Sequence, residues 1–445
     1  MGGNRYTVGV YEVDARLHNR YNRCDMSESQ PQPLSNDPPA GAPPEPPKRA
    51  LAILFMIVFA DLMGFGLIVP LLPFYGKTYL PSDLAITLLF SVYSLCQLIA
   101  SPLLGSLSDR YGRRPVLIFS QIGSVVGYVM LAGVSMMHWD PAHLWIAVAL
   151  LFTSRVVDGA SGGNISAAQA YISDITAPAN RAKAMGLIGT AFGIGFAVGP
   201  AIGGVLGHFH PSYPALAAAG FCALAAILTT LFLPETRVHK PTSGASIFHP
   251  RVFAPIFAQP VARNVLLIWF FSMIAFVMIE ATFALFLNAR FGYGPWQVGW
   301  FFAYVGLTIA FVQGVLIGRL TTRFGEWRLM LAGPILVTVA MGLYFTSNYW
   351  PLVGLLIVAG FLNATGRSLQ GPTLSSVLSQ NVAPHQQGIA FGLYHSIGSL
   401  ARVIGPPMAG LSFERHHAAP FLLAGIITLS VAVWTGILWR RARTG

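Results

Sequence analysis

Residues 105–115 read Gly105-Ser106-Leu107-Ser108-Asp109-Arg110-Tyr111-Gly112-Arg113-Arg114-Pro115. This short segment holds three arginines and lies between two apolar runs that are each long enough to cross a bilayer. A basic turn cannot lie in hydrocarbon, and Lys and Arg close to helix ends are retained on the cytoplasmic side. We therefore expect residues 105–115 to form a tight turn at the cytoplasmic surface of a membrane.

A degenerate copy of this segment follows 213 positions later, over residues 318–328. Gly, Leu, Arg and Gly recur at matching places, whereas Thr322 stands where the first copy has Asp109. The repeat predicts a chain built from two related membrane units whose basic turns are not equivalent.

The composition is that of a membrane protein. The chain has 445 residues, of which 54% are hydrophobic and 10% charged, against about 25% charged in soluble proteins. The net charge of +11 is spread over short loops, which argues against a nucleic-acid partner. Cys24, Cys96 and Cys222 have no disulfide or metal-site spacing, so we expect no metal and no cofactor.

Twelve apolar spans of helical length follow Lys48, each near the 20 residues that a bilayer requires. They cover 50–75, 84–107, 114–136, 143–173, 183–208, 214–233, 263–290, 296–320, 328–347, 351–378, 386–411 and 418–439. We therefore predict an all-α membrane protein with an N-terminal six-helix bundle over 50–233, a cytoplasmic linker over 234–262 and a C-terminal six-helix bundle over 263–440.

Residues 1–49 are polar and rich in proline, so we expect a disordered cytoplasmic tail. Met26 is followed by Ser-Glu-Ser and resembles a native start, which makes residues 1–25 a candidate upstream extension. Of the 27 Lys and Arg residues, 21 fall on the side of both termini and 3 on the other side. This bias predicts cytoplasmic termini.

A few ionisable residues stand inside the spans, where a charge costs ~2.5–3.5 kcal/mol. Asp61 lies in the first span, Arg155 and Asp158 in the fourth, Glu280 in the seventh and Arg367 in the tenth. An apolar sequence that retains these residues indicates a functional site in the membrane interior.

Three further motifs accompany the basic turn. They read Asp61-x-x-Gly64-x-Gly66-x-x-x-Pro70-x-x-Pro73, Arg155-x-x-x-Gly159-x-x-x-Gly163 and Gly195-x-x-x-Gly199-Pro200-x-x-Gly203-Gly204. In this order, and with twelve spans in two halves, the sequence resembles the major facilitator superfamily over roughly residues 50–440. It looks most like the drug/proton antiporter branch that includes the tetracycline exporters.

The resemblance implies a secondary transporter of the inner (plasma) membrane, not an enzyme. Such a protein would export hydrophobic or amphiphilic small molecules by alternating access, driven by protons that enter the cell. Its partners would be the cargo, protons and the lipid bilayer, and we expect a monomer. Proton-coupled uptake of a small metabolite is the alternative within transport, and a membrane receptor with a transporter fold is the alternative from another class.

The resemblance also assigns candidate residues. In the family the first, fourth, seventh and tenth spans line a central cavity, so proton coupling and the cavity would involve Asp61, Arg155, Asp158, Glu280 and Arg367. The alternatives are a static pair between Arg155 and Asp158, three residues apart on one helix, and bonds from Arg367 and Arg402 to backbone carbonyls. The aromatic residues of the seventh and eighth spans would supply one or two cavity residues each.

Two motifs would act on conformation. The gate motif comprises Gly105, Asp109, Arg110, Gly112, Arg113 and Arg114, although its arginines could serve only as topology anchors. The antiporter-type packing motif comprises Gly195, Gly199, Pro200, Gly203 and Gly204, and the resemblance places it against the eighth span between the halves. Ordinary glycine packing of membrane helices is the alternative.

Overall fold

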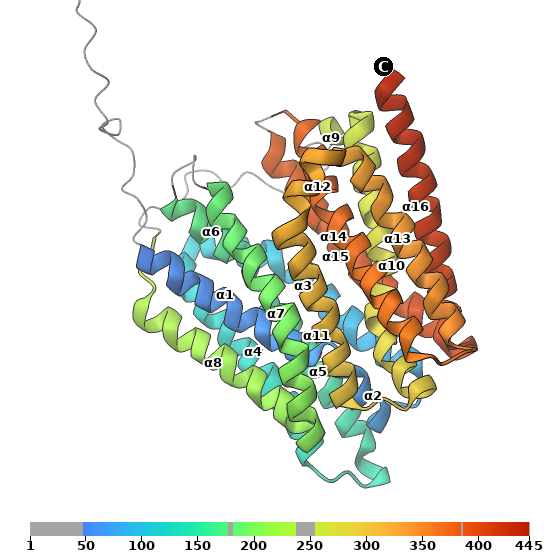
Figure 1. Ribbon diagram of the computed structural model, residues 1–445. Helices are drawn as coiled ribbons and strands as arrows, with labels where there is room; N and C mark the ends of the chain where they lie inside the picture. Colours follow the sequence, from blue (N-terminus) through green and yellow to red (C-terminus); the bar gives the residue numbers. More distant parts are fainter. Residues whose placement is uncertain (1–47, 177–180, 237–253, 384–385, 445) are drawn as a thin grey trace, which may run out of the picture. The chain divides into compact units, whose positions relative to one another are not determined.

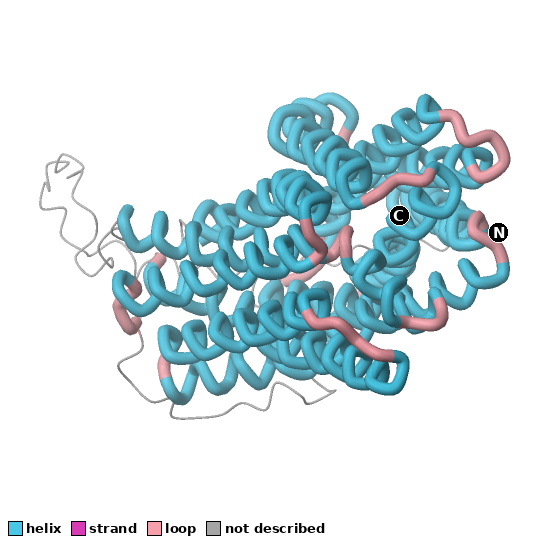
Figure 2. The backbone as a smooth tube through the Cα atoms, turned by 90° about the horizontal axis from the view of Figure 1, so that it is seen from below, coloured by secondary structure: helices cyan, strands magenta, loops and turns pink. Residues whose placement is uncertain are grey.

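The computed structural model describes residues 48–176, 181–236, 254–383 and 386–444. These residues belong to one compact unit, residues 45–445. Within the described ranges the chain consists of helices and loops, without a strand (Figure 2). Nearly all of the predicted tail, and residues 237–253 of the predicted linker, lie outside the described residues, so both remain predictions.

The first half contains eight α-helices in the described region. They are α1 (Lys48–Ile68), α2 (Leu72–Tyr79), α3 (Asp83–Tyr111), α4 (Arg113–Met136), α5 (Leu144–Ser161), α6 (Ile165–Ile175), α7 (Arg181–Phe209) and α8 (Ser212–Phe232). Short breaks divide two of the predicted spans. The first span consists of α1 and α2, with a break near Pro70, and the fourth consists of α5 and α6, with a break at Gly162–Asn164.

The second half repeats this pattern after a short helix, α9 (Ala254–Ala258). Its helices are α10 (Pro260–Phe291), α11 (Pro295–Phe311), α12 (Ile317–Phe324), α13 (Glu326–Ser347), α14 (Val353–Gln380), α15 (Gln387–Arg415) and α16 (Ala419–Thr444). A π-helical turn over Val312–Leu316 joins α11 to α12. Figure 1 shows both groups of helices in the colours of the sequence.

Each predicted span corresponds to one of these helices or to a consecutive pair. By length and composition, eight helices of the described residues suffice to cross a membrane, or nine if the bent pair α1–α2 is one span. Helices α14 and α15 are 28 and 29 residues long but carry more polar residues. The all-α membrane fold is therefore confirmed, while the number of twelve spans stays a prediction.

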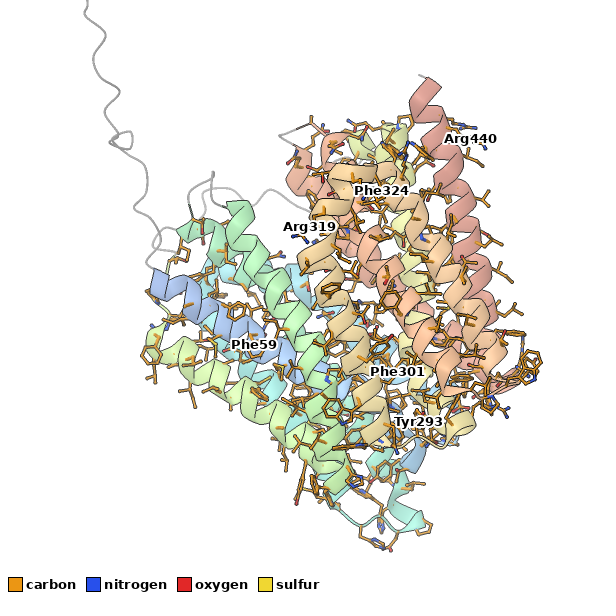
Figure 3. The ribbon with its side chains drawn as sticks, in the orientation of Figure 1. Phe59, Tyr293, Phe301, Arg319, Phe324 and Arg440 are labelled. Atoms are coloured by element: carbon orange, nitrogen blue, oxygen red, sulfur yellow. The ribbon has the colours of Figure 1, made fainter. Side chains whose placement is uncertain are left out.

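Two ends of the helical unit can be distinguished. The basic end carries the turn at Gly112, the equivalent turn at Gly325 and the C-terminal arginines, and Figure 3 shows Arg319 and Arg440 there with Tyr293 far from them. The opposite end carries α2 and the loops near residues 80, 210, 293 and 417.

The two halves meet close to the opposite end. Helix α7 contacts α11, and α3 contacts α15. The Lys77 ammonium donates a hydrogen bond to Oδ1 of Asn288 at 2.7 Å, and Oε1 of Glu414 accepts one from the backbone N–H of Leu84 at 3.0 Å. At the basic end the ribbons of α6 and α12 stand apart (Figure 1).

Candidate functional site

The basic turn is shorter than the sequence predicts. Helix α3 continues to Tyr111 and α4 begins at Arg113, so Gly112 alone stands between them. Its φ of 105° lies in the left-handed region, which favours glycine. Gly105 lies inside α3, where an added Cβ would make only an ordinary contact with Ser166, so its predicted role at the corner is wrong.

The second copy has the same backbone geometry. Helix α12 ends at Phe324, α13 begins at Glu326, and Gly325 between them has a φ of 79°. This correspondence supports the internal repeat. The side-chain contacts of this turn differ from those of the first one. Here the Glu326 carboxylate accepts hydrogen bonds from Oγ of Ser376 at 2.6 Å and from Nε2 of Gln380 at 2.9 Å, both on α14.

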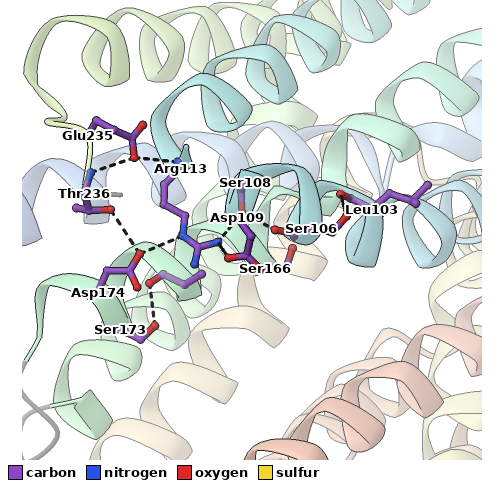
Figure 4. A network of polar contacts seen from close by, with 12 residues as sticks. Leu103, Ser106, Ser108, Asp109, Arg113, Ser166, Ser173, Asp174, Glu235 and Thr236 are labelled. Carbon is purple, nitrogen blue, oxygen red and sulfur yellow. Dashed lines mark hydrogen bonds and ion pairs between the residues drawn. The ribbon is translucent and has the colours of Figure 1, made fainter. Parts of the chain in front are cut away.

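Arg113 is the centre of a polar cluster in the first half (Figure 4). Its side chain is buried, and its guanidinium contacts Oδ1 of Asp109 at 2.8 Å, Oδ2 of Asp174 at 3.0 Å and Oγ of Ser108 at 2.7 Å. Asp109 therefore pairs with an arginine of the same motif. The cluster ties the α3–α4 corner to the end of α6.

Glu235 completes this cluster, and the sequence reasoning missed it. Its carboxylate accepts hydrogen bonds from the backbone N–H groups of Arg113 at 3.0 Å and Arg114 at 3.1 Å. A carboxylate at a helix N-terminus satisfies free donors and complements the helix dipole. An acidic residue directly after the sixth span was the available signal, but Glu235 had been assigned to the linker. Arg114 itself donates to the Thr230 carbonyl, whereas Arg110 is exposed.

Arg155 and Asp158 form a buried ion pair on α5. Nη1 of Arg155 lies 3.2 Å from Oδ2 of Asp158, and the two residues are only 3% and 2% exposed. Gly159 on α5 and Gly163 in the break that follows α5 allow this segment to pack closely on α3. A Cβ on Gly159 would collide with the backbone of Tyr93, and one on Gly163 would lie 2.8 Å from the backbone nitrogen of Ser101. The glycines of this motif thus permit close packing of α3 against the helix that carries Arg155.

The second half supplies its own charged group. Oε2 of Glu280 on α10 lies 3.6 Å from Nη1 of Arg402 on α15. The guanidinium carbon of Arg367 lies 3.4 Å from the centre of the Phe276 ring, a cation–π contact. Arg402 therefore pairs with an acid rather than with a backbone carbonyl, and the sequence reasoning did not foresee this pair.

One cavity brings residues of both halves together. Its lining comprises Phe65, Ile68, Val69, Leu72, Phe90, Tyr93, Ser94, Tyr128, Arg155, Val277, Glu280 and Arg402. The space between them amounts to about 420 Å³ when its open mouth is included.

Of the predicted cavity residues, Arg155 and Glu280 are in the wall, Asp158 is paired with Arg155, and Arg367 is not in the wall. Asp61 lies on α1, but its side chain is outside what the structure describes.

The aromatic wall of the cavity comes from the first half. Phe65, Phe90, Tyr93 and Tyr128 belong to α1, α3 and α4. The prediction that aromatics of the seventh and eighth spans line the cavity is wrong. Phe283 of α10, for example, packs within the second half against Phe301, Tyr344 and Phe421.

The glycines of α7 lie between two neighbouring helices. A Cβ on Gly199 or Gly203 would collide with the backbone of α1. A Cβ on Gly204 would lie 2.7 Å from the carbonyl oxygen of Pro295 and 2.8 Å from Cα of Gly299, both on α11. The predicted packing of this helix against the eighth span is therefore seen in the structure.

Two groups of apolar helices around a shared cavity that holds charged side chains fit the class of multi-pass membrane transporters. A family profile of the Major Facilitator Superfamily matches residues 54–349 and 281–445, and the chain belongs to that superfamily.

Its relatives include resistance proteins. The chain is 32% identical to the tetracycline resistance protein, class B, of Escherichia coli, covering 87% of this chain and 90% of that protein. It is 31% identical to multidrug resistance protein 1 of Bacillus subtilis (strain 168), covering 88% of this chain and 96% of that protein.

Solved structures agree in fold. The crystal structure of the human organic anion transporter MFSD10 (TETRAN) matches with a TM-score of 0.64 and 25% identity, covering 88% of this chain and 100% of that one. A D-xylose-proton symporter matches with a TM-score of 0.72 at 15% identity, covering 86% of this chain and 96% of that one, which supports the fold alone.

Proposed function

We propose that this protein exports hydrophobic or amphiphilic small molecules from the cytoplasm across the inner membrane in exchange for protons. The observation that carries the proposal is the cavity in which Arg155 of one half faces the same space as Glu280 and Arg402 of the other. Charges in a membrane interior are expensive unless they line a polar pathway. Relatives that are named for tetracycline and multidrug resistance favour export over uptake.

Alternating access would follow from the placement of contacts between the halves. They touch at the opposite end through α7–α11 and α3–α15, and α6 and α12 stand apart at the basic end. If the basic end faces the cytoplasm, as the charge bias of the loops predicts, these contacts would close the outer side of the protein in this conformation. The gate cluster of Asp109, Arg113, Asp174 and Glu235 would stabilise the first half while the basic end closes in the other state.

Proton coupling would use the acids near the cavity. Asp61 and Glu280 are the proposed proton carriers, and each would release its proton inside and reload outside. The pairing of Glu280 with Arg402 supports such a role, because protonation of the carboxyl would release Arg402. Asp158 and Arg367 would act on these groups through their charges rather than by direct contact with cargo.

The test uses everted membrane vesicles from a pump-deficient bacterial host. A toxicity screen with dyes, antibiotics and quaternary amines first identifies a cargo. That cargo should accumulate in everted vesicles when their interior is acidic, and a protonophore should abolish the accumulation. Accumulation in right-side-out vesicles with a proton gradient directed inward would instead establish uptake and overturn export.

A further inference from the structure

Two contacts fix how α13 and α16 pack against each other in the second half. Oγ1 of Thr338 donates a hydrogen bond to Oγ1 of Thr428 at 2.9 Å, and a Cβ on Gly436 would lie 3.8 Å from Cδ1 of Leu331. Between these contacts the chain moves seven residues towards the basic end on α13 and eight on α16. The two helices are therefore antiparallel, and residues near their basic ends can be matched in depth.

The same register brings two arginines to one level. Arg328 lies three residues beyond Leu331 towards the basic end, and Arg440 lies four residues beyond Gly436 in that direction. With a rise of about 1.5 Å per residue, their Cα atoms differ in depth by roughly 2 Å. Both side chains are exposed, and Figure 3 shows Arg440 at the end of α16. Because the turns of antiparallel helices run in opposite senses when both are viewed from the basic end, the two arginines lie on the same side of the α13–α16 contact.

Each arginine ends a stripe of apolar side chains. Positions three, seven and eleven residues from an arginine share its face of the helix, and the apolar residues at such positions are exposed. They are Ile335 and Val339 on α13 and Leu429, Val433 and Ile437 on α16. The surface thus combines two apolar stripes with a pair of cations at their basic end. A phospholipid matches this pattern, because its acyl chains lie in the hydrocarbon and its phosphate lies at the membrane surface.

The second half contains few acids that could balance its arginines. Its acids are Glu280 in the cavity wall, Glu414 at the opposite end and Glu326 at the start of α13. The Glu326 carboxylate accepts its hydrogen bonds from side chains of α14. The arginines of the basic end in this half are Arg263, Arg319, Arg323, Arg328, Arg440 and Arg441. This excess of positive charge attracts anions to the end of the α13–α16 surface.

We propose that the surface formed by the two stripes binds an anionic phospholipid, with its phosphate between Arg328 and Arg440 and its acyl chains along the stripes. Charge complementarity selects a headgroup of net negative charge, since basic residues at the cytoplasmic ends of membrane helices attract anionic lipids. The apolar stripes select a lipid over a soluble anion. Because it contacts both α13 and α16, the bound lipid holds the two helices together at their basic ends.

Native mass spectrometry of the purified full chain in detergent measures the affinity for the first bound lipid. Two probes with the same acyl chains are compared. Palmitoyl-oleoyl phosphatidylglycerol is anionic, and palmitoyl-oleoyl phosphatidylcholine is zwitterionic. Each basic residue at a membrane surface strengthens the binding of anionic lipid about fivefold. The wild type should therefore bind phosphatidylglycerol roughly 25-fold more tightly than phosphatidylcholine.

Substitutions locate the site. Arg328→Gln and Arg440→Gln should each weaken the binding of phosphatidylglycerol about fivefold, and the double variant should bind the two lipids equally. Lysine at both positions keeps the charges and should retain most of the affinity. Arg323→Gln is the matched control, because Arg323 is an exposed arginine at the same end but belongs to α12, outside the two stripes. It should leave the affinity unchanged. Thermal unfolding of each variant verifies that it is folded.

Equal affinities of the wild type for the two lipids would overturn the inference. A loss in Arg323→Gln as large as that in Arg328→Gln would also overturn it, since the basic end would then attract lipid through its total charge alone. If the double variant keeps the preference for phosphatidylglycerol, the lipid binds elsewhere. If dihexanoyl phosphatidylglycerol or inorganic phosphate competes as well as the long-chain lipid, the arginines bind a soluble anion and the apolar stripes have no part in recognition.

Discussion

Gly204 offers a direct way to disturb the contact between the halves. In the structure, a Cβ at this position would lie 2.7 Å from the Pro295 carbonyl oxygen and 2.8 Å from Cα of Gly299, both backbone atoms of α11. Backbone atoms cannot move aside as a flexible side chain can, so Gly204→Ala must separate α7 from α11. Overpacking of this kind costs about 1–3 kcal/mol. The population of the state in which the halves touch here should therefore fall roughly 5- to 150-fold relative to the alternative state.

Distances between spin labels measure this shift in a variant without native cysteines. One label pair, at Tyr213 and Trp350, reports on the opposite end, and the other, at Leu231 and Arg323, reports on the basic end; all four side chains are exposed. Gly204→Ala should lengthen the first distance and shorten the second.

Gly220→Ala on α8 is the matched control, because a Cβ there would meet no atom within 4 Å. It should leave both distances as they are in the wild type. Distance distributions that are identical in all three proteins would refute the assignment of α7 and α11 as the contact that opens and closes.

Other contacts give further predictions. Asp109→Asn removes the charge of a half-exposed partner of Arg113, and such an ion pair contributes roughly 1 kcal/mol or less. The variant should slow turnover severalfold with little change in cargo affinity. An unchanged turnover rate would favour the interpretation that the arginines of the motif only anchor the topology. Glu235→Ala should lower the free energy of unfolding by about 0.5–2 kcal/mol through loss of the α4 cap, measured by thermal unfolding, while Glu235→Gln retains an acceptor and should lose less. Glu414→Ala frees the N-terminus of α3 and should increase the fraction of molecules that are open at the opposite end in the label measurement; equal fractions would exclude a closing role for Glu414. Asp61→Asn should abolish gradient-driven transport at normal expression, and full activity would remove Asp61 from proton coupling.

The repeat of the basic turn was the most informative feature of the sequence. It located both corners, at Gly112 and Gly325, because each copy places a glycine two residues after an arginine, and both glycines have a left-handed backbone. The turn is shorter than expected because the residues from Ser106 to Arg110 remain helical, with partners inside the protein. The hydroxyls of Ser106 and Ser108 donate hydrogen bonds to carbonyl oxygens of the preceding turn, and Asp109 pairs with Arg113. For the cap by Glu235 the sequence offers only an acidic residue after the sixth span, because the helix N-terminus that this residue meets depends on where α8 ends in space.

The charged site was foreseen in part. Arg155 and Glu280 could be recognised because they interrupt apolar spans, and both line the cavity. The partnership of Glu280 with Arg402 joins residues far apart in the chain, and no local pattern specifies which face of α15 turns towards α10. The aromatic wall was assigned to the wrong half for a similar reason. Helix α10 is apolar on every side, so its sequence does not indicate which of its phenylalanines face the cavity.

Cysteine accessibility tests most directly whether the two halves share one cavity that opens to each side in turn. Ser94 on α3 and Val277 on α10 both line the cavity, and each is replaced singly by cysteine in a chain without native cysteines. We predict that a membrane-impermeant thiol reagent labels both positions in everted vesicles and in right-side-out vesicles, and that bound cargo protects both. If either cysteine resists the reagent from both sides, or if cargo protects one and leaves the other reactive, the two walls do not enclose a common transport site.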